Sequence, residues 1–441
     1  MTSGVQMILA LLIGVGILIY MILKTKIHAF PALIISASVI GIIGGLGPAQ
    51  TIEAISSGFG GTLGSIGIVI GLGVMMGKLL EISGGAEQMA ASFLKTVGKG
   101  REEWALGLTG AAVSIPVFCD SGFVILIGLA KSLSKKTGRS IVVLGISLAA
   151  GLVATHHTIP PTPGPLAVAG IYGADIGQMI LVGLFLACFI LVGTILYAKT
   201  LAKKIEIDVD DLIDQAAQKF DEEQLPAAGL SFSPIAVPIF LILLNTLFSA
   251  FEIENSLVSV VTFLGDPAIA VMIGLLIAIY GLVSKLETAE ITEQLEKSLA
   301  SAAVIIFVTG AGGALGSVLR ASGIGDFVAE QVAEFSIPML LIPFVIATLV
   351  RLVQGSGTVA MITAASITAP IVANSSLNPV IAAQATTVGA MIFSYFNDSF
   401  FWVVTKFLGL DVKQGIRAWS MTTTVAWLSG LVGLVIMNIF I

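Results

Sequence analysis

Charged residues are scarce in this sequence: Asp, Glu, Lys and Arg make up 11% of the 441 residues, whereas hydrophobic residues make up 56%. The mean hydropathy is +1.04. A soluble protein of this size could not bury so much apolar surface. Runs of about 20 apolar residues recur along the chain, and each is long enough to cross the roughly 30 Å hydrocarbon core of a bilayer as a helix. Composition therefore excludes a soluble protein and favours a polytopic membrane protein.

Three further absences narrow the class. Segments of alternating polarity, the pattern of membrane strands, are missing, so we expect an all-α fold. The two cysteines, Cys119 and Cys188, lie in separate apolar segments and define no disulfide framework. The net charge of −6 comes largely from one acidic loop, which gives no basic surface for nucleic acid.

Basic residues are also missing before the first apolar stretch, residues 5–23, whereas Lys24 and Lys26 follow it. The stretch is too long for the apolar core of a signal peptide. Because basic residues favour the cytoplasmic side, we expect a retained first helix whose N-terminus lies outside.

A polar stretch rich in Asp and Glu divides the chain almost in half. Four short segments of the first half recur in the second, in the same order and 235 to 239 positions later: 30–34 with 266–270, 77–84 with 316–323, 120–122 with 355–357, and the His156 region with 395–398. This pattern predicts two repeats, residues 1–198 and 233–441, joined by an acidic cytoplasmic linker at 199–232.

The two repeats are expected to have opposite orientations. Basic residues flank both ends of the apolar stretch 104–133, which favours the cytoplasm for both ends, and the interruption at 119–122 favours a re-entrant hairpin. The mirrored stretch, 337–373, is broken at 354–358 and should enter from outside. Each half then has about five transmembrane helices and one hairpin, an odd number of crossings, so the C-terminus also lies outside. Inverted repeats with interrupted helices are typical of transporters and place the binding site near the midplane.

Polar residues deep in apolar stretches are functional candidates because burying them in lipid is unfavourable. In the first hairpin, Ser121 and Gly122 are expected to open the second helix, whose free N–H groups attract an anion. Asp120, a carboxylate in a low-dielectric pocket, is suited to carry a proton. An N-cap aspartate without a transport role is the alternative.

The segment 155–165 holds four prolines in six residues, which prevent a continuous helix. Thr162 and Pro163 predict the cap and first turn of a new helix, and Thr162 is a candidate substrate contact. His156 is expected to bind a carboxylate or to carry a proton. A packing histidine is the alternative, above all for His157. No third ligand stands nearby in helical spacing, so no metal site is expected.

The second hairpin tip offers Gly355, Ser356, Gly357 and Thr358, where glycines permit close backbone approach and hydroxyls add donors beside a helix N-terminus. Arg351, in the apolar helix before this tip, is suited to a bidentate pair with a substrate carboxylate.

Asn397, Asp398 and Ser399 interrupt the crossing that mirrors the His156 segment. Asn397 and Ser399 are candidate partners of substrate hydroxyls, and Asp398 is a second candidate proton carrier. Two alternatives stay open: a capped helix restart at Asp398, and a structural ion pair of Arg351 with Asp398 or Asp120.

These residues together resemble the gluconate permease family of proton symporters over essentially the whole chain. The resemblance is carried by Gly58-x-Gly60-Gly61-Thr62-Leu63-Gly64, by Pro116-x-Phe118 followed by an acidic residue and Gly122-Phe123-Val124, by His156-x-x-x-Pro160-Pro161-x-Pro163-Gly164-Pro165, by Gly170-x-x-Gly173-Ala174-Asp175-Ile176-Gly177, by Gly355-Ser356-x-Thr358-Val359-Ala360-Met361, and by Asp398-Ser399-x-Phe401-Trp402.

The resemblance implies proton-coupled uptake of gluconate or a related acid, such as glycerate, fructuronate or D-serine, across the bacterial inner membrane. It implies a small carboxylate, protons and the lipid bilayer as partners, a homodimer of hairpin-containing transport domains on a scaffold, and no cofactor besides the proton gradient. The chain departs from the family at Asp120, where several members have Glu, and at Thr162, where they have His.

Three rival functions remain open from the residues. The first is a sodium-coupled dicarboxylate carrier, and the second is an ion channel. The third is an intramembrane hydrolase that uses Ser121 or Ser356 with His156. Saturable accumulation against a gradient separates a carrier from a channel, and product formation identifies a hydrolase.

Overall fold

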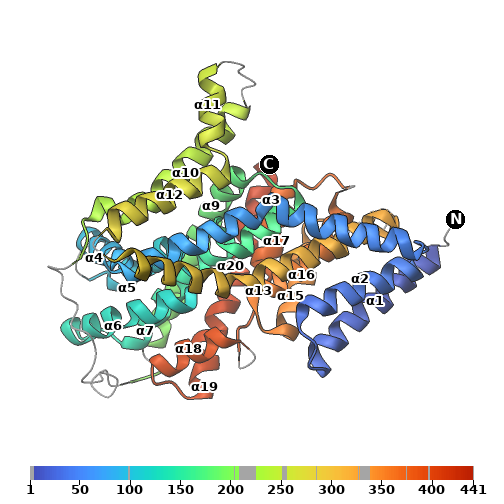
Figure 1. Cartoon of the computed structure of the whole chain (residues 1–441). Coiled ribbons are helices and arrows are strands. Elements are labelled where there is room, and N and C mark those ends of the chain that lie inside the picture. The colour runs from blue at the N-terminus through green and yellow to red at the C-terminus, as the bar shows by residue number, and fades with distance from the viewer. Residues whose placement is uncertain are drawn as a thin grey trace.

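The computed structural model describes residues 4–97, 100–202, 204–207, 225–250, 256–284, 286–325, 327, 338–373, 375–395 and 398–440. Every regular element within these ranges is a helix, so the predicted all-α class is confirmed (Figure 1). Among the described residues, five helices are long and apolar enough to cross a membrane, or up to seven if each of two bent helix pairs forms one span. The chain is therefore built as a multi-pass membrane protein.

The helices of the first half follow the predicted apolar runs and breaks. They are α1 (Gly4–Lys24), α2 (Ala29–Ile43), α3 (Pro48–Ile82), α4 (Gly85–Val97), α5 (Glu102–Val113), α6 (Cys119–Thr137), α7 (Ile141–Thr158), α8 (Pro163–Tyr172) and α9 (Ile176–Leu201).

The helices of the second half include two short π-helical turns. They are α10 (Ala228–Ala250), α11 (Ser256–Leu264), α12 (Pro267–Ile277), η3 (Ala278–Leu282), α13 (Thr288–Ala321), α15 (Leu341–Gln354), α16 (Gly357–Val372), α17 (Pro379–Gly389), α18 (Ser399–Phe407), α19 (Val412–Gly415), η4 (Ile416–Ser420) and α20 (Met421–Phe440).

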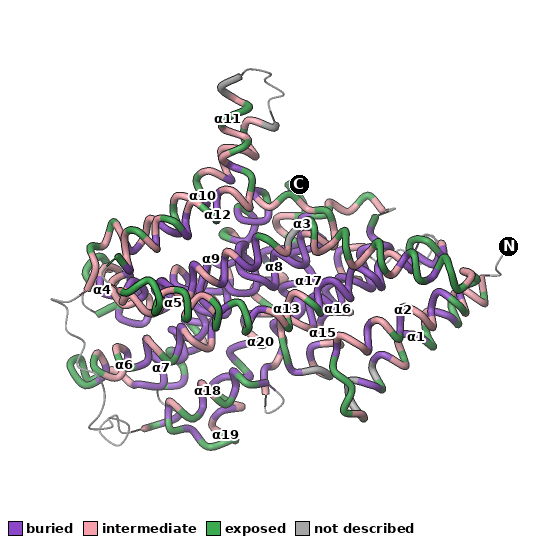
Figure 2. The backbone as a smooth tube through the Cα atoms, viewed as in Figure 1, coloured by how far each residue is buried: buried purple, intermediate pink, exposed green. Residues whose placement is uncertain are grey.

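The centre of the bundle is formed by α7, α8, α16 and α17 (Figure 2). All residues of α7 and most of those of α8, α16 and α17 are buried, which fits helices that are hydrophobic all round. Buried polar groups join the halves here. The Gln384 amide donates to the carbonyls of Thr158 and Met179 at 2.8 and 3.0 Å, and it thereby satisfies a backbone carbonyl freed at the end of α7.

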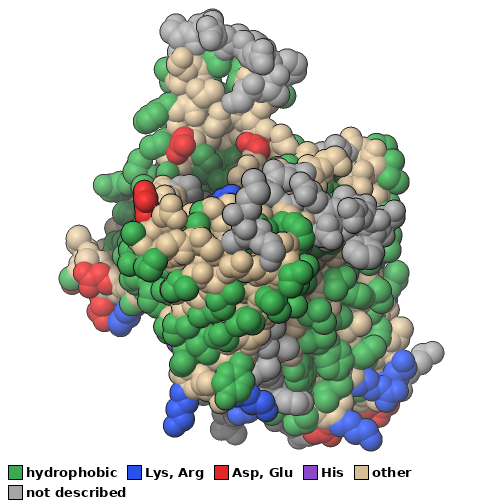
Figure 3. Space-filling view, turned by 90° about the vertical axis from the view of Figure 1, so that its right-hand side faces the viewer, with side chains coloured by type: hydrophobic (Ala, Val, Ile, Leu, Met, Phe, Trp, Pro, Cys, Tyr) green, Lys and Arg blue, Asp and Glu red, His purple; other side chains and the backbone are tan. Residues whose placement is uncertain are grey.

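Hydrophobic side chains cover the outside of the molecule. Figure 3 shows a face that is mainly hydrophobic, with most of its charged side chains near the lower and left edges. Large apolar side chains on several helices are more than half exposed, among them Leu12, Leu181, Leu196, Phe240 and Val432. In water such a surface would drive aggregation, whereas lipid tails solvate it.

Two buried carboxylates at the start of α5 form ion pairs with partly exposed basic side chains. Glu103, at the start of α5, is 1% exposed, and its two oxygens pair with Arg139 Nη1 at 3.2 Å and Lys199 Nζ at 2.7 Å. Arg139 Nε also lies 3.3 Å from Glu102. These contacts tie α5 to the α6–α7 turn and to the end of α9.

The contact between α5 and α7 depends on glycine. A Cβ on Gly151 would overlap the carbonyl oxygen of Gly107, and one on Gly110 would overlap that of Leu148. Thr155 Oγ1 donates to the Ala111 carbonyl at 2.7 Å across the same contact. Small residues of this kind let membrane helices approach closely.

Replacing Gly151 by alanine should therefore destabilise the protein by about 3 kcal/mol, because a methyl group would push α5 away from α7. The thermal denaturation midpoint in detergent measures this effect. Gly128→Ala on α6 is the matched control, since its Cβ would meet no atom within 4 Å. Equal midpoints for the two variants would contradict the proposed role of this contact.

Most predicted breaks agree with the structure. The second hairpin breaks at Gly355, between α15 and α16, and Thr162 with Pro163 begins α8 as a cap and first-turn pair. In the first hairpin, however, the interruption lies at 114–118, and Cys119 to Gly122 already belong to α6. The ends of the predicted linker 199–232 are helical, since α9 continues to Leu201 and α10 begins at Ala228. Residues 203 and 208–224 of this linker lie outside the described ranges.

Candidate functional site

A cavity of about 290 Å³ lies where the interrupted segments meet. Its wall combines the start of α6, the end of α7, the tip between α15 and α16, and the segment between α17 and α18, with α13, η4 and α20 completing it. Pockets for small molecules usually measure about 300–1,000 Å³. The volume therefore suits a small solute.

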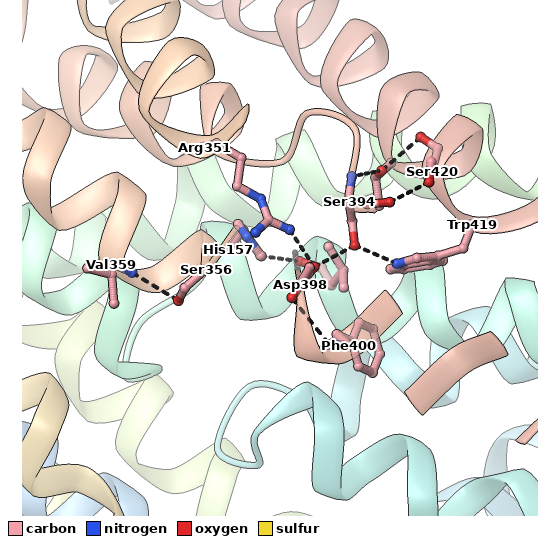
Figure 4. Close-up of polar contacts among 11 residues, drawn as sticks. His157, Arg351, Ser356, Val359, Ser394, Asp398, Phe400, Trp419 and Ser420 are labelled. Atoms are coloured by element: carbon pink, nitrogen blue, oxygen red, sulfur yellow. Dashed lines mark hydrogen bonds and ion pairs between the residues drawn. The ribbon is translucent and has the colours of Figure 1, made fainter. Parts of the chain in front are cut away.

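An ion pair crosses this cavity. Arg351 Nη2 on α15 lies 2.5 Å from Asp398 Oδ2, and the two side chains are 5% and 10% exposed (Figure 4). The backbone N–H of Phe400 donates to the other carboxylate oxygen at 3.2 Å, so Asp398 also caps α18. Of the alternatives left open by the sequence, both the capped helix restart and the pair with Asp398 are present.

A second layer of hydrogen bonds holds Asp398 in place. The Ser394 hydroxyl donates to Asp398 Oδ2 and accepts from Trp419 Nε1 at 2.9 Å. The Ser394 backbone N–H donates to Thr423 Oγ1 at 2.9 Å, and the Ser420 hydroxyl donates to the Ser394 carbonyl. Figure 4 shows this chain of contacts running from Arg351 to Trp419 and Ser420. Asp398 is therefore a fixed carboxylate whose charge is balanced by a guanidinium.

Several other polar atoms of this cavity have no partner. Nine buried side-chain atoms in the described part of the chain lack a hydrogen bond, and five of them belong to cavity residues: Asp120 Oδ1, His156 Nδ1, His157 Nε2, and Nε and Nη1 of Arg351. Leaving one such atom unsatisfied is unfavourable by about 1–3 kcal/mol. Their concentration in one place indicates a site that a polar ligand completes.

Helix N-termini add donors to the same cavity. No side chain caps α6 at its N-cap residue Phe118, and the first turn of α6 includes Asp120. At α16, the Ser356 hydroxyl accepts from the Val359 N–H at 3.4 Å. Gly355, with φ of +87°, makes the turn that brings this helix start to the cavity. Free N–H groups at a helix start favour an anion.

The structure brings together eight of the predicted site residues as lining of this cavity: Asp120, His156, Arg351, Ser356, Gly357, Thr358, Asp398 and Ser399. Gly355 forms the adjoining turn. Asn397 lies outside the described residues.

Three predicted residues lie apart from the cavity lining. Ser121 lines a different cavity, of about 180 Å³, together with Lys78 and Glu81. Gly122 packs against the Leu152 side chain. Thr162 is 1% exposed, and its hydroxyl donates to the Ile159 carbonyl at 2.5 Å. Its side chain therefore stabilises the turn before α8.

Twelve lining residues were not among the predicted site residues, and four of these carry a side-chain nitrogen or oxygen: His157, Ser394, Trp419 and Thr423. For His157 the sequence left a packing role and a functional role open, and its position next to His156 was a usable signal. Ser394, Trp419 and Thr423 were missed entirely. These three lie in apolar segments where single polar or aromatic residues are common, so no local pattern marks them.

No group of three or more His, Cys, Asp or Glu side chains is placed to hold a metal ion in the ranges that the structure describes. The cavity instead offers a guanidinium, two carboxylates, two imidazoles and several hydroxyls. This set of groups is suited to binding an organic anion and moving a proton.

Comparison with known proteins gives consistent matches along the whole chain. A family model described as GntP family permease matches residues 6–440. An uncharacterized permease of Haemophilus influenzae is 49% identical, over 98% of this chain and 92% of its own length. A gluconate permease of Pseudomonas aeruginosa is 33% identical, over 100% and 99%. The crystal structure of the YdaH transporter from Alcanivorax borkumensis shares the fold, with a TM-score of 0.67 at 14% identity, over 93% of this chain and 98% of that one.

Proposed function

Because the chain belongs to the GntP permease family, whose members are transporters rather than enzymes, we propose that it imports gluconate or a related small sugar acid by proton symport. The observation that carries this proposal is Arg351: one guanidinium nitrogen is paired with Asp398, and two buried ones have no partner in the cavity that Arg351 lines.

A sugar acid matches the groups around Arg351. Its carboxylate would accept hydrogen bonds from Arg351 Nε and Nη1, which form a fork suited to two oxygens. Its hydroxyls would meet Ser356, Thr358 and Ser399, which line the same cavity. The start of α16 places further N–H donors beside the carboxylate.

The charges of the cavity favour a monocarboxylate. Arg351 is the only Lys or Arg among the described lining residues, whereas Asp120 and Asp398 are both acidic. A second carboxylate on the substrate would meet acidic groups without a cation to balance it. This argument favours a sugar acid over the dicarboxylate of the rival sodium-coupled carrier.

The partners of the two carboxylates suggest different roles. Asp398 accepts from a guanidinium, a hydroxyl and a backbone N–H, so its oxygens already have fixed partners. Asp120 has a buried oxygen without a partner in the described part of the chain. We therefore assign the coupled proton to Asp120, with His156, which lines the same cavity and whose Nδ1 also lacks a partner, as the group that relays it.

The proposal includes an inverted repeat of two halves, residues 1–198 and 233–441, each with about five membrane helices and one re-entrant hairpin. The order of the helices supports it, since α2, α3, α5 and α6 recur with similar lengths as α12 with η3, α13, α15 and α16. Both termini would lie outside the bacterial inner membrane, the acidic linker 199–232 would lie inside, and two copies would form a dimer.

Uptake of labelled gluconate into proteoliposomes tests the function. An inward proton gradient should drive accumulation above the outside concentration, and replacing sodium by potassium should have no effect. Unlabelled gluconate should compete, and tartrate, a dicarboxylate, should not. Accumulation driven by sodium alone, without stimulation by the proton gradient, would contradict proton symport.

A further inference from the structure

His157 differs from a packing histidine in the state of its two ring nitrogens. Its Nδ1 lies 3.2 Å from the carbonyl oxygen of Val153, one turn earlier on α7. A carbonyl oxygen can only accept, so Nδ1 carries the hydrogen, and Nε2 of the neutral ring is an acceptor. The side chain is 6% exposed, and Nε2 has no partner in the described ranges.

The free nitrogen is directed at the start of α16. A Cβ added to Gly357, the first residue of that helix, would overlap Nε2 of His157. His157 and Arg351 line the same cavity, and both are labelled in Figure 4. An acceptor therefore shares this cavity with the two free donors of Arg351, at the start of a helix that favours an anion.

We propose that His157 selects 2-hydroxy acids, because Nε2 accepts a hydrogen bond from the hydroxyl on the carbon next to the substrate carboxylate. The inference rests on the proposed function and names a specificity residue for it. The 2-hydroxyl is bonded to the carbon next to the carboxylate carbon. When Arg351 binds the carboxylate, this hydroxyl therefore lies close to the carboxylate oxygens, in the cavity that His157 also lines.

Specificity of this kind is expected to be strong. A site with a buried acceptor rejects a substrate that lacks the matching donor, because the acceptor then stays unsatisfied. Wild-type protein should therefore prefer gluconate over 2-deoxygluconate by about ten- to a hundredfold in apparent affinity.

Competition uptake in proteoliposomes, with gluconate and 2-deoxygluconate as competitors of labelled gluconate, tests the inference. His157→Leu removes the acceptor and should bring the ratio of the two apparent affinities close to one. The apparent affinity for gluconate should fall, whereas that for 2-deoxygluconate should change by less than about threefold. His157→Gln retains an acceptor oxygen and should keep part of the preference. His28→Leu is the matched control, because His28 caps α2 outside the cavity, and it should keep the full preference.

Gly357→Ala tests the same acceptor without changing His157, and it is used if the His157→Leu protein does not insert into the membrane or fold. Its methyl group would lie against Nε2 and block the acceptor, so the preference for gluconate should be lost. A preserved preference in both His157→Leu and Gly357→Ala, with gluconate uptake intact, overturns the inference and leaves the proposed function standing. Absence of uptake of either acid by the wild type overturns both.

Discussion

Replacing Arg351 by glutamine should reduce gluconate uptake by about a thousandfold, because the substrate loses its only cationic partner and Asp398 is left as an unpaired buried charge. Lysine at this position retains a charge but lacks the planar fork, so Arg351→Lys should recover only part of the uptake. Initial rates in proteoliposomes measure both variants, and stabilisation of the detergent-solubilised protein by gluconate measures binding independently of transport.

Two further variants separate the binding role of Arg351 from a structural one. Arg320→Gln is the matched control, since Arg320 ends α13 on an exposed position, and its uptake should stay near that of wild type. Combining Arg351→Gln with Asp398→Asn removes both charges and should restore thermal stability without restoring uptake. Strong gluconate uptake by Arg351→Gln, or by the double variant, would show that the carboxylate binds elsewhere.

Replacing Asp120 by asparagine should abolish proton-driven accumulation while exchange of labelled for unlabelled gluconate continues. Asparagine has a similar shape but cannot take up a proton, so the loaded site loses its coupling to the proton gradient. With one proton carried per substrate, a pH difference of two units drives accumulation up to about a hundredfold, and the variant should fall to about one. Asp120→Glu, which retains a carboxyl group, should recover accumulation.

The same measurements on Asp398→Asn give the contrasting result. Asp398 holds Arg351 through the 2.5 Å ion pair, so its loss should impair exchange as well as accumulation. If the Asp120→Asn protein accumulates gluconate at the wild-type level, Asp120 does not carry the coupled proton, and Asp398 or His156 becomes the candidate. Loss of exchange in Asp120→Asn, in protein that is otherwise folded, would give Asp120 a role in substrate binding instead.

The positions of the broken segments could be predicted from the sequence because backbone chemistry is local. Pro160 and Pro161 follow the end of α7, whereas Pro163 and Pro165 lie in the first turn of α8, where a missing N–H is tolerated. Gly355 adopts the positive φ that other residues avoid. Asp120, His156, Arg351 and Asp398 could be marked as candidates because charged and polar residues are rare in apolar runs, where burying them is unfavourable unless they are paired or functional.

The direction of individual side chains could not be predicted in this way. Asp120 and Ser121 are adjacent in the first turn of α6, yet they line different cavities, because successive residues point about 100° apart around a helix. Thr162 was expected at the substrate, but its hydroxyl has a nearer acceptor in the Ile159 carbonyl. The choice depends on which faces the neighbouring helices cover.

The sequence by itself therefore determined that this chain is an all-helical membrane protein of the permease family, and which polar residues interrupt its apolar segments. Only the tertiary structure decided that Arg351 pairs with Asp398 rather than with Asp120, that His157 presents a free acceptor, and that Ser394, Trp419 and Thr423 support the site. Helix breaks depend on the local backbone and on the need to satisfy every backbone hydrogen bond in lipid. Pairs of polar side chains depend instead on contacts between segments that are far apart in the sequence.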